Sequence, residues 1–153
     1  MSAAPPKLRR AVPGDLAAII AVQRAAYAKN RVLLGVEPLP LQADYAVVLR
    51  DYEVWVTEAL DAVLILEPRA DDLLVWSVAS APQAQGAGLG NRLLAFAERR
   101  ARENGVAQIR LYTGEKLSDN VAWYHRKGYV TERVEQRADR TVVHLIKTLD
   151  RGE

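Results

Sequence analysis

The stretch Val78-Ala-Ser-Ala-Pro-Gln-Ala-Gln-Gly-Ala-Gly-Leu-Gly90, followed directly by Asn91-Arg-Leu-Leu94, is the most informative part of this chain. The apolar, β-branched residues 73–78 predict a strand at its start. Leucine and alanine then recur at the spacing of one helix face, to about residue 104. The three glycines between strand and helix permit positive φ and close approach of a ligand to the backbone. Free backbone N–H groups at the positive end of a helix dipole favour a phosphate group there.

Two common phosphate-binding loops do not match this stretch. A P-loop requires Lys-Ser or Lys-Thr after its last glycine, whereas Asn91-Arg follows Gly90. A dinucleotide-binding loop requires glycines at relative positions one, three and six, but here they are Gly86, Gly88 and Gly90. That loop is also followed, about 20 residues on, by an acidic residue that binds the ribose, whereas residues 108–110 are Gln-Ile-Arg.

The pattern that does fit is Gln85-Gly-Ala-Gly88-Leu-Gly90, preceded by Val78-Ala and Pro82. It resembles the acetyl-CoA loop of the GCN5-related N-acetyltransferase (GNAT) superfamily, written Gln/Arg-x-x-Gly-x-Gly/Ala. A second segment is similar to the family's downstream strand–helix unit, with its Asn, Tyr and Gly-aromatic ending: Leu111-Tyr-Thr113, then Asn120, Ala122, Tyr124, Gly128 and Tyr129. The resemblance covers about residues 7–149.

Strands alternating with helices in the middle of the chain, and hairpins at both ends, predict an α/β or α+β fold with helices on both faces of a mixed sheet. The resemblance narrows this to the GNAT acyltransferase fold, whose central mixed sheet is mostly antiparallel. In that fold the strand before the glycine loop and the strand after its helix splay apart to admit the cofactor. We expect one N-acetyltransferase domain over residues 7–153 and a flexible tail over residues 1–6.

The expected order of elements follows from periodicity and breakers. We expect strands at 7–12, 53–59, 63–67, 73–79, 107–113, 129–136 and 141–149. Helices are expected to begin at Asp15, to cover about 44–50, to run from the glycine loop to about 104–105, and to cover 118–127. Residues 30–43 are expected to be irregular, because Gly35, Pro38 and Pro40 interrupt any period. The turn at residues 60–62 lacks the Asp-Gly of a typical hairpin, so the register there is less certain.

The resemblance implies a set of cofactor-binding residues. The backbone of Val78, Ala79 and Ser80 would pair with the pantetheine arm as an added strand does. Backbone amides of the loop would hold the pyrophosphate; its members are Gln85, Gly86, Ala87, Gly88, Leu89, Gly90 and Asn91. Asn120 also matches the family pattern, although a helix-capping role fits it nearly as well. The alternative for the loop is a turn shaped only for helix–sheet packing. Ser77 and Ser80 depart from the residues often found there. Either hydroxyl could contact substrate or cofactor, but we expect both to satisfy backbone groups.

Tyr124 is the predicted catalytic residue. Acyl transfer expels a thiolate whose conjugate thiol has a pKa near ~8.5, and a phenol with a pKa near ~10 can donate a hydrogen bond and a proton to it. The competing interpretation is an aromatic core residue packed with Trp123 and Tyr129.

The general base is not assigned by the sequence. A lysine-like amine has a pKa near ~10.4, so only a small fraction is neutral at pH 7, and a base, a water chain or a desolvating pocket must supply the nucleophile. Many family members carry a glutamate on the strand before the loop, but residues 73–77 read Leu-Leu-Val-Trp-Ser. Glu37, Glu58 and Glu115 are the substitutes considered. The leucines among residues 30–43 suggest either an acceptor with an apolar part or packing against the first helix.

Composition excludes several other classes. With 21 basic and 19 acidic residues the net charge is +2, which favours neither nucleic acid nor a membrane surface as a partner. There is no cysteine, and His125 and His144 lack ligand spacing, so no metal site is expected. His125 is expected to point away from Tyr124, and His144 to be structural. No signal peptide or membrane-length apolar run is evident, which favours the cytoplasm.

The resulting hypothesis is an acetyl-CoA-dependent transferase that acetylates a primary amine of a small molecule or peptide by direct attack. One alternative is a non-catalytic acyl-CoA-binding or regulatory module, which the missing strand carboxylate favours and Tyr124 opposes. Another is acetylation of a protein lysine or N-terminus, which differs only in its acceptor. The sequence leaves the oligomeric state open between a monomer and a homodimer.

Overall fold

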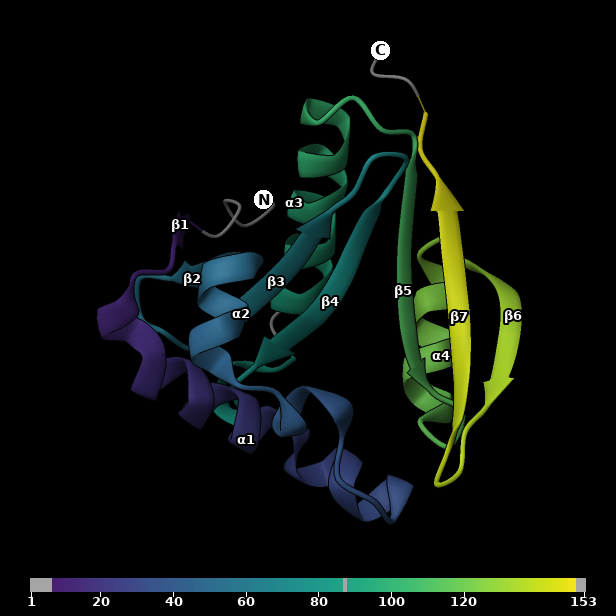
Figure 1. Ribbon diagram of the computed structural model, residues 1–153, viewed down its shortest axis with the longest axis horizontal. Coiled ribbons are helices and arrows are strands. Elements are labelled where there is room, and N and C mark those ends of the chain that lie inside the picture. Colours follow the sequence, from purple (N-terminus) through teal and green to yellow (C-terminus); the bar gives the residue numbers. More distant parts are fainter. Residues whose placement is uncertain (1–6, 87, 151–153) are drawn as a thin grey trace.

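The computed structural model describes residues 7–86 and 88–150, so the expected tail at residues 1–6 lies outside the described part (Figure 1). The strands are β1 (Leu8–Arg10), β2 (Glu53–Thr57), β3 (Ala62–Pro68), β4 (Leu73–Ser80), β5 (Gln108–Gly114), β6 (Val130–Gln136) and β7 (Thr141–Thr148). The helices are α1 (Leu16–Leu34), α2 (Tyr45–Asp51), α3 (Leu89–Glu103) and α4 (Ser118–Arg126), with 3₁₀ turns at Pro13–Asp15, Leu39–Gln42 and Pro82–Ala84.

The strands form one sheet in the order β1-β2-β3-β4-β5-β7-β6. Every neighbouring pair is antiparallel except β4 and β5, which are parallel because α3 connects them as a crossover. This arrangement confirms the expected mixed, mostly antiparallel sheet with helices on both faces.

Two apolar clusters bury the two faces of the sheet, and β3 contributes to both because its side chains alternate. Leu64 and Leu66 belong to the cluster that includes α3. Val63 and Ile65 belong to the cluster that includes α1 and α2. All four side chains are fully buried, so β3 reads as a continuous apolar run.

Helix α3 shows why the glycine loop can be found from sequence. Its apolar face packs on the sheet and consists of the buried residues Leu89, Leu93, Leu94, Ala97 and Ala101. Its N-cap, Gly88, has φ of +77°, and Gly105 just beyond its C-terminal end has φ of +76°. Both backbone conformations strain residues that carry a Cβ.

A β-bulge in β4 marks the place where the sheet opens. Ile65 pairs with Ser77 and Leu66 pairs with Val75, so Trp76 is an extra residue in β4. The pairing of β4 with β5 ends at Val75, and the two strands then diverge (Figure 1). The splay expected from the resemblance is therefore present.

The bulge also turns two consecutive side chains of β4 towards α1 and α2. The Trp76 ring lies 6.2 Å from the ring of Tyr45. The Ser77 hydroxyl accepts a hydrogen bond from Gln23 of α1 at 3.0 Å. Without the extra residue, one of the two side chains would face α3 instead.

One predicted segment is partly wrong. Residues 30–43 were expected to be irregular, but α1 continues to Leu34 and ends at Gly35, whose φ is +73°. Val32 is 81% exposed and Leu33 is 49% exposed, so this last helical turn lacks the polar and apolar alternation that would reveal it.

The turn after β2 closes without glycine. Leu60 takes a φ of +54°, and the Thr57 hydroxyl donates to Asp61 Oδ1 at 2.6 Å while accepting from the Asp61 backbone N–H. These side-chain bonds supply the tight closure that Asp-Gly normally provides.

Candidate active site

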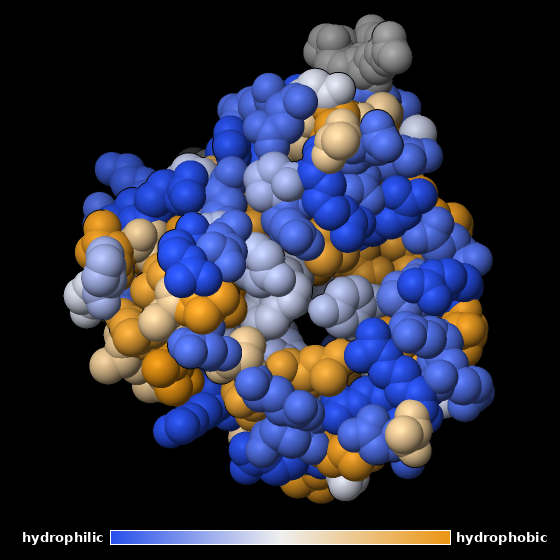
Figure 2. All heavy atoms as spheres, viewed as in Figure 1, coloured by the Kyte–Doolittle hydropathy of each residue, from blue (hydrophilic) through white to orange (hydrophobic). Residues whose placement is uncertain are grey.

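A cavity of about 840 Å³ lies where β4 and β5 part. It is lined from both layers of helices: by α1 and the loop after it on one side, and by the glycine loop and α4 on the other. Figure 2 shows the molecular surface hollowed in this region, between the α1 side and the β5–β7 side of the molecule. The opening in the sheet thus gives one cavity that is lined from both layers of helices.

Nearly every residue predicted from the sequence to bind a cofactor lines this cavity. The set comprises Val78, Ala79, Ser80, Gln85, Gly86, Gly88, Leu89, Gly90, Asn91 and Asn120. Ala87 lies outside the described residues. The structure therefore brings together the glycine loop, the end of β4 and the start of α4, which are separated by up to about forty positions in the chain.

The glycine loop presents the start of a 15-residue helix to the cavity. Gly86 and Gly88 both have positive φ, +88° and +77°. The Gln85 side chain donates to the Ser80 carbonyl at 2.9 Å, which ties the loop to the end of β4. The first N–H groups of α3 have no partner within the helix, and its dipole is positive here, so the loop is suited to an anion.

The end of β4 offers backbone groups on its open edge. On one side, Ser80 and Ala79 pair with Ala62 and Val63 of β3. On the other side, the pairing with β5 has already ended at Val75. An extended amide-containing chain can therefore add to this edge as a further strand would.

Tyr124 lies on α4 and lines the cavity together with Asn120, one turn earlier on the same helix face. Its ring is 4.9 Å from the Trp123 ring and 5.9 Å from the Tyr129 ring. Burial raises the pKa of the Tyr124 phenol above its usual value, with a smaller contribution from Tyr27. The raised pKa keeps the hydroxyl protonated at neutral pH, and the hydroxyl makes no hydrogen bond to any described residue, so its hydrogen is available to a ligand.

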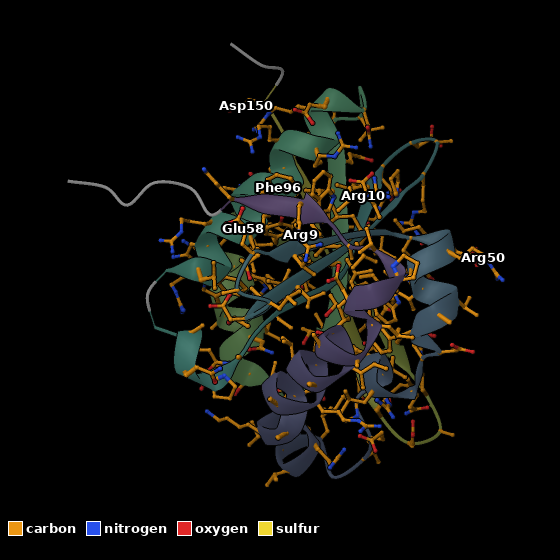
Figure 3. All side chains as sticks on the ribbon, turned by 90° about the vertical axis from the view of Figure 1, so that its left-hand side faces the viewer. Arg9, Arg10, Arg50, Glu58, Phe96 and Asp150 are labelled. Carbon is orange, nitrogen blue, oxygen red and sulfur yellow. The ribbon has the colours of Figure 1, made fainter. Side chains whose placement is uncertain are left out.

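None of the three glutamates considered as a base lines the cavity. Glu37 forms an ion pair with Arg31 at 2.9 Å, and Glu58 lies near Arg9 at the β1 edge (Figure 3). Glu115 is exposed beyond the end of β5. Among the described lining residues the one carboxylate is Asp119, which is exposed.

Neither His125 nor His144 lines the cavity. His125 is exposed and lies within hydrogen-bond distance of the Thr131 hydroxyl, at 3.1 Å. His144 forms a 2.9 Å hydrogen bond with Glu135 on the neighbouring strand.

A buried polar network next to the cavity escaped the sequence analysis. Gln23, which is fully buried, donates to the Tyr45 hydroxyl at 2.8 Å and to Ser77 at 3.0 Å. The Tyr27 and Ser77 hydroxyls are 2.9 Å apart, and the Tyr45 hydroxyl donates to the Pro40 carbonyl at 2.6 Å. Ser77 therefore bonds to side chains, not to the backbone as expected. The available signal was Gln23 and Tyr27, a polar pair four residues apart on an otherwise apolar helix face.

Comparisons with known proteins agree with this architecture. The family model of the acetyltransferase (GNAT) domain matches residues 50–131, more than half of the 153 residues. The chain therefore belongs to the GNAT acetyltransferase family. No curated protein sequence matches it significantly.

Solved structures share the fold over nearly the whole chain. One is an acetyltransferase assigned to the GNAT family from Desulfovibrio desulfuricans, with 20% identity, a TM-score of 0.75 and coverage of 93% of this chain and 98% of that one. The PaiA N-acetyltransferase of Thermoplasma acidophilum, in complex with coenzyme A, has 16% identity, a TM-score of 0.73 and coverage of 93% and 98%. The ribosomal-protein-S18-alanine N-acetyltransferase of Escherichia coli has 16% identity, a TM-score of 0.72 and coverage of 96% of each chain.

Within residues 7–86 and 88–150, no helix combines the length and the apolar character that crossing a membrane requires.

Proposed function

We propose that the protein transfers the acetyl group of acetyl-CoA to a primary amine, with the amine attacking the thioester directly. The observation that carries this proposal is that the glycine loop at the start of α3 and Tyr124 of α4 line one cavity, at the point where β4 and β5 separate. The complex of a structural neighbour with coenzyme A supports the choice of cofactor.

In this proposal the amides of residues 85–91 hold the pyrophosphate, and the open edge of Val78, Ala79 and Ser80 pairs with the pantetheine amides. Asn120 contributes a side-chain contact from the first turn of α4. The thioester then lies in the gap between the two strands, within reach of Tyr124.

The chemical step is addition followed by elimination. The lone pair of the neutral amine attacks the carbonyl carbon, so a C–N bond forms and the C–S bond breaks. The sulfur that leaves takes a proton from the Tyr124 hydroxyl, and the proton of the new ammonium passes through water back to the Tyr124 oxygen, which restores the acid. Because burial raises the pKa of Tyr124, its phenol stays protonated at neutral pH and can donate a hydrogen bond to the leaving sulfur. The same rise makes the phenol a weaker acid, so its proton moves only as negative charge develops on the sulfur.

The second candidate function is binding of acyl-CoA without turnover. The finding that favours it is the lack of a buried carboxylate among the described lining residues, where Asp119 is exposed. Acetylation of a protein lysine or N-terminus is a variant of the main proposal. The Escherichia coli neighbour, the ribosomal-protein-S18-alanine N-acetyltransferase, is an example of an enzyme with a protein acceptor.

Two measurements test the proposal. Titration calorimetry with coenzyme A and acetyl-CoA is expected to show binding, and absence of heat with both ligands would refute the loop assignment. Release of free thiol with a panel of amines then separates a transferase from a binding module. Binding with no turnover of any amine would favour the second candidate.

A further inference from the structure

Arg140, in the turn between β6 and β7, lines the cavity although its side chain is only 6% exposed. Its Nε and Nη2 donate to the Asp139 carboxylate, both at 3.1 Å. Its Nη1 donates to no described residue. An arginine held by two bonds, whose third nitrogen donates to no described residue, is a preorganised donor for an anion in the cavity that it lines.

Arg140 lies on the opposite side of the cavity from the cofactor loop. The glycine loop, Asn120 and Tyr124 belong to the layer of α3 and α4. Arg140 precedes Val142, which pairs with Gly114 at the end of β5, where Leu34 of α1 covers the glycine. The side of the cavity under α1 is therefore left for the acceptor, and Arg140 is part of that side.

A count of hydrogens shows a second hydrogen-bond donor among the residues that line the same cavity. Tyr45 uses its hydrogen on the Pro40 carbonyl, so Gln23 must donate to it, and Gln23 uses its other amide hydrogen on Ser77. The single bond between Ser77 and Tyr27 consumes one of their two hydroxyl hydrogens. One hydrogen remains on a pair of hydroxyls that both line the cavity.

The charged residues that line the cavity are mostly basic, which also favours an anionic ligand. Its described lining includes Lys29, Lys116 and Arg140 against the single carboxylate of Asp119. A polycationic acceptor such as a polyamine would meet like charge here, whereas an anionic group on the acceptor would be attracted.

We infer that the acceptor is an amine that also carries a carboxylate, as a free amino acid or a peptide with a nearby C-terminus does, and that Arg140 binds this carboxylate. The inference rests on the proposed function and specifies its substrate class. A carboxylate matches the site better than a phosphate monoester does. One free guanidinium nitrogen and one hydroxyl hydrogen suit a single negative charge, and Asp139 already offsets part of the arginine's charge.

The test uses sets of amines that differ only in the anionic group. Phenylalanine, leucine and glycine are each compared with their own primary amide and with the amine that remains after decarboxylation. Phosphoethanolamine is the test compound that carries a phosphate in place of the carboxylate. Thiol release from acetyl-CoA is measured for each, together with calorimetric binding of each amine to the protein alone and to the protein saturated with coenzyme A. The carboxylate forms are expected to bind and react best.

Three variants locate the effect. Arg140→Gln is expected to lower binding and kcat/KM for the carboxylate amines roughly 10- to 100-fold, and to change the values for the amides less than about 3-fold. Arg140→Lys keeps the charge and is expected to recover part of the loss. Arg137→Gln removes an equal charge from the same turn but does not line the cavity, so it is expected to leave the preference intact.

The outcomes separate the two proposals. Carboxylate amines that bind the wild type no better than their amides, or equal losses in the Arg137 and Arg140 variants, would overturn the inference. A preference for phosphoethanolamine would overturn the carboxylate assignment. Failure to bind acetyl-CoA would instead refute the proposed function, while binding of the amines to the protein alone still decides the role of Arg140. Normal acetyl-CoA affinity of Arg140→Gln shows that this variant is folded.

Discussion

The indole N–H of Trp123 in α4 donates a hydrogen bond of 2.9 Å to Oδ1 of Asn91 in α3. The two residues belong to helices on the two halves of the sheet that part at β4 and β5, so this bond links the halves on the side of the cavity that α3 and α4 line. The same indole ring would lie 3.4 Å from a Cβ on Gly90, which shows how closely α4 approaches the glycine loop.

Trp123→Phe is expected to weaken coenzyme A binding about 3- to 10-fold, because the loop loses the bond that positions Asn91. The loss of stability should be only about 1 kcal/mol, since the aromatic packing is retained. Calorimetry and urea denaturation measure the two effects. Trp55→Phe is the control: its N–H donates to Glu53, away from the cavity, so it should lower stability and leave coenzyme A affinity unchanged.

Gly88→Val is expected to abolish binding of coenzyme A. A branched side chain at φ +77° strains the N-cap of α3 and occupies the approach of a phosphate to the helix start. Gly105→Val is a matched control, because Gly105 has φ of +76° and lies at the other end of the same helix, with open space around it. Both variants should lose similar stability in urea melts. Coenzyme A affinity that survives in the Gly88 variant, or is lost in the Gly105 variant, would contradict the proposed loop.

Tyr124→Phe is expected to lower kcat by at least about 10-fold and to leave acetyl-CoA affinity nearly unchanged, because the phenol hydrogen is used on the leaving thiolate. Steady-state thiol release and calorimetry check the two quantities. Tyr129→Phe serves as the comparison: its buried hydroxyl donates to Glu98, and the residue does not line the cavity. The Tyr129→Phe variant should be less stable than the wild type and should keep the wild-type kcat. Equal kcat in wild type and Tyr124→Phe would remove the acid role.

Alkaline pH is expected to destabilise the protein through Tyr27. Burial raises the pKa of this phenol to about 12, and the hydrogen bond with Ser77 opposes the rise. The unfolded chain ionises near pH ~10, so this residue's contribution is complete below pH 10 and is lost as the pH rises from 10 to 12. The loss is limited to about 3 kcal/mol.

Urea denaturation of wild type and Tyr27→Phe at pH 9, 10.5 and 11.5 measures this effect. The free-energy gap between the two proteins should narrow or reverse as the pH rises, although other buried tyrosines give both proteins some alkaline loss. Val32→Ala, at an exposed position of the same helix, should keep a constant gap to wild type. A pH-independent gap for Tyr27→Phe would show that its phenol is not perturbed.

The parts of the site that sequence predicts are those whose chemistry is local. Gly86 and Gly88 are needed at positive φ within a single loop, and Asn120 and Tyr124 share a face because they are one helical turn apart. The family resemblance rests on the same local patterns, and the family match confirms it. The catalytic and binding roles of these residues stay predictions until the experiments above are done.

The predictions failed where no local sequence pattern marks the structure. The last turn of α1 was missed because Val32 and Leu33 are apolar yet exposed, so no periodic pattern marks the helix there. Ser77 was expected to bond the backbone, but the bulge at Trp76 turns it towards Gln23. The general base was left unassigned, and Glu37, Glu58 and Glu115 were only considered for it; the structure places none of them in the cavity lining.

The sequence by itself determined the order of strands and helices, the glycine loop and the family, because periodicity, breakers and motif spacing act over a few residues. Tertiary structure alone decided that β4 and β5 part at Val75, that Gln23, Tyr27 and Ser77 form one buried network, and that Arg140 comes to the cavity from a distant turn. The physical reason is that these arrangements depend on contacts between segments tens of residues apart. Such contacts arise only when the two layers of helices pack on the opened sheet.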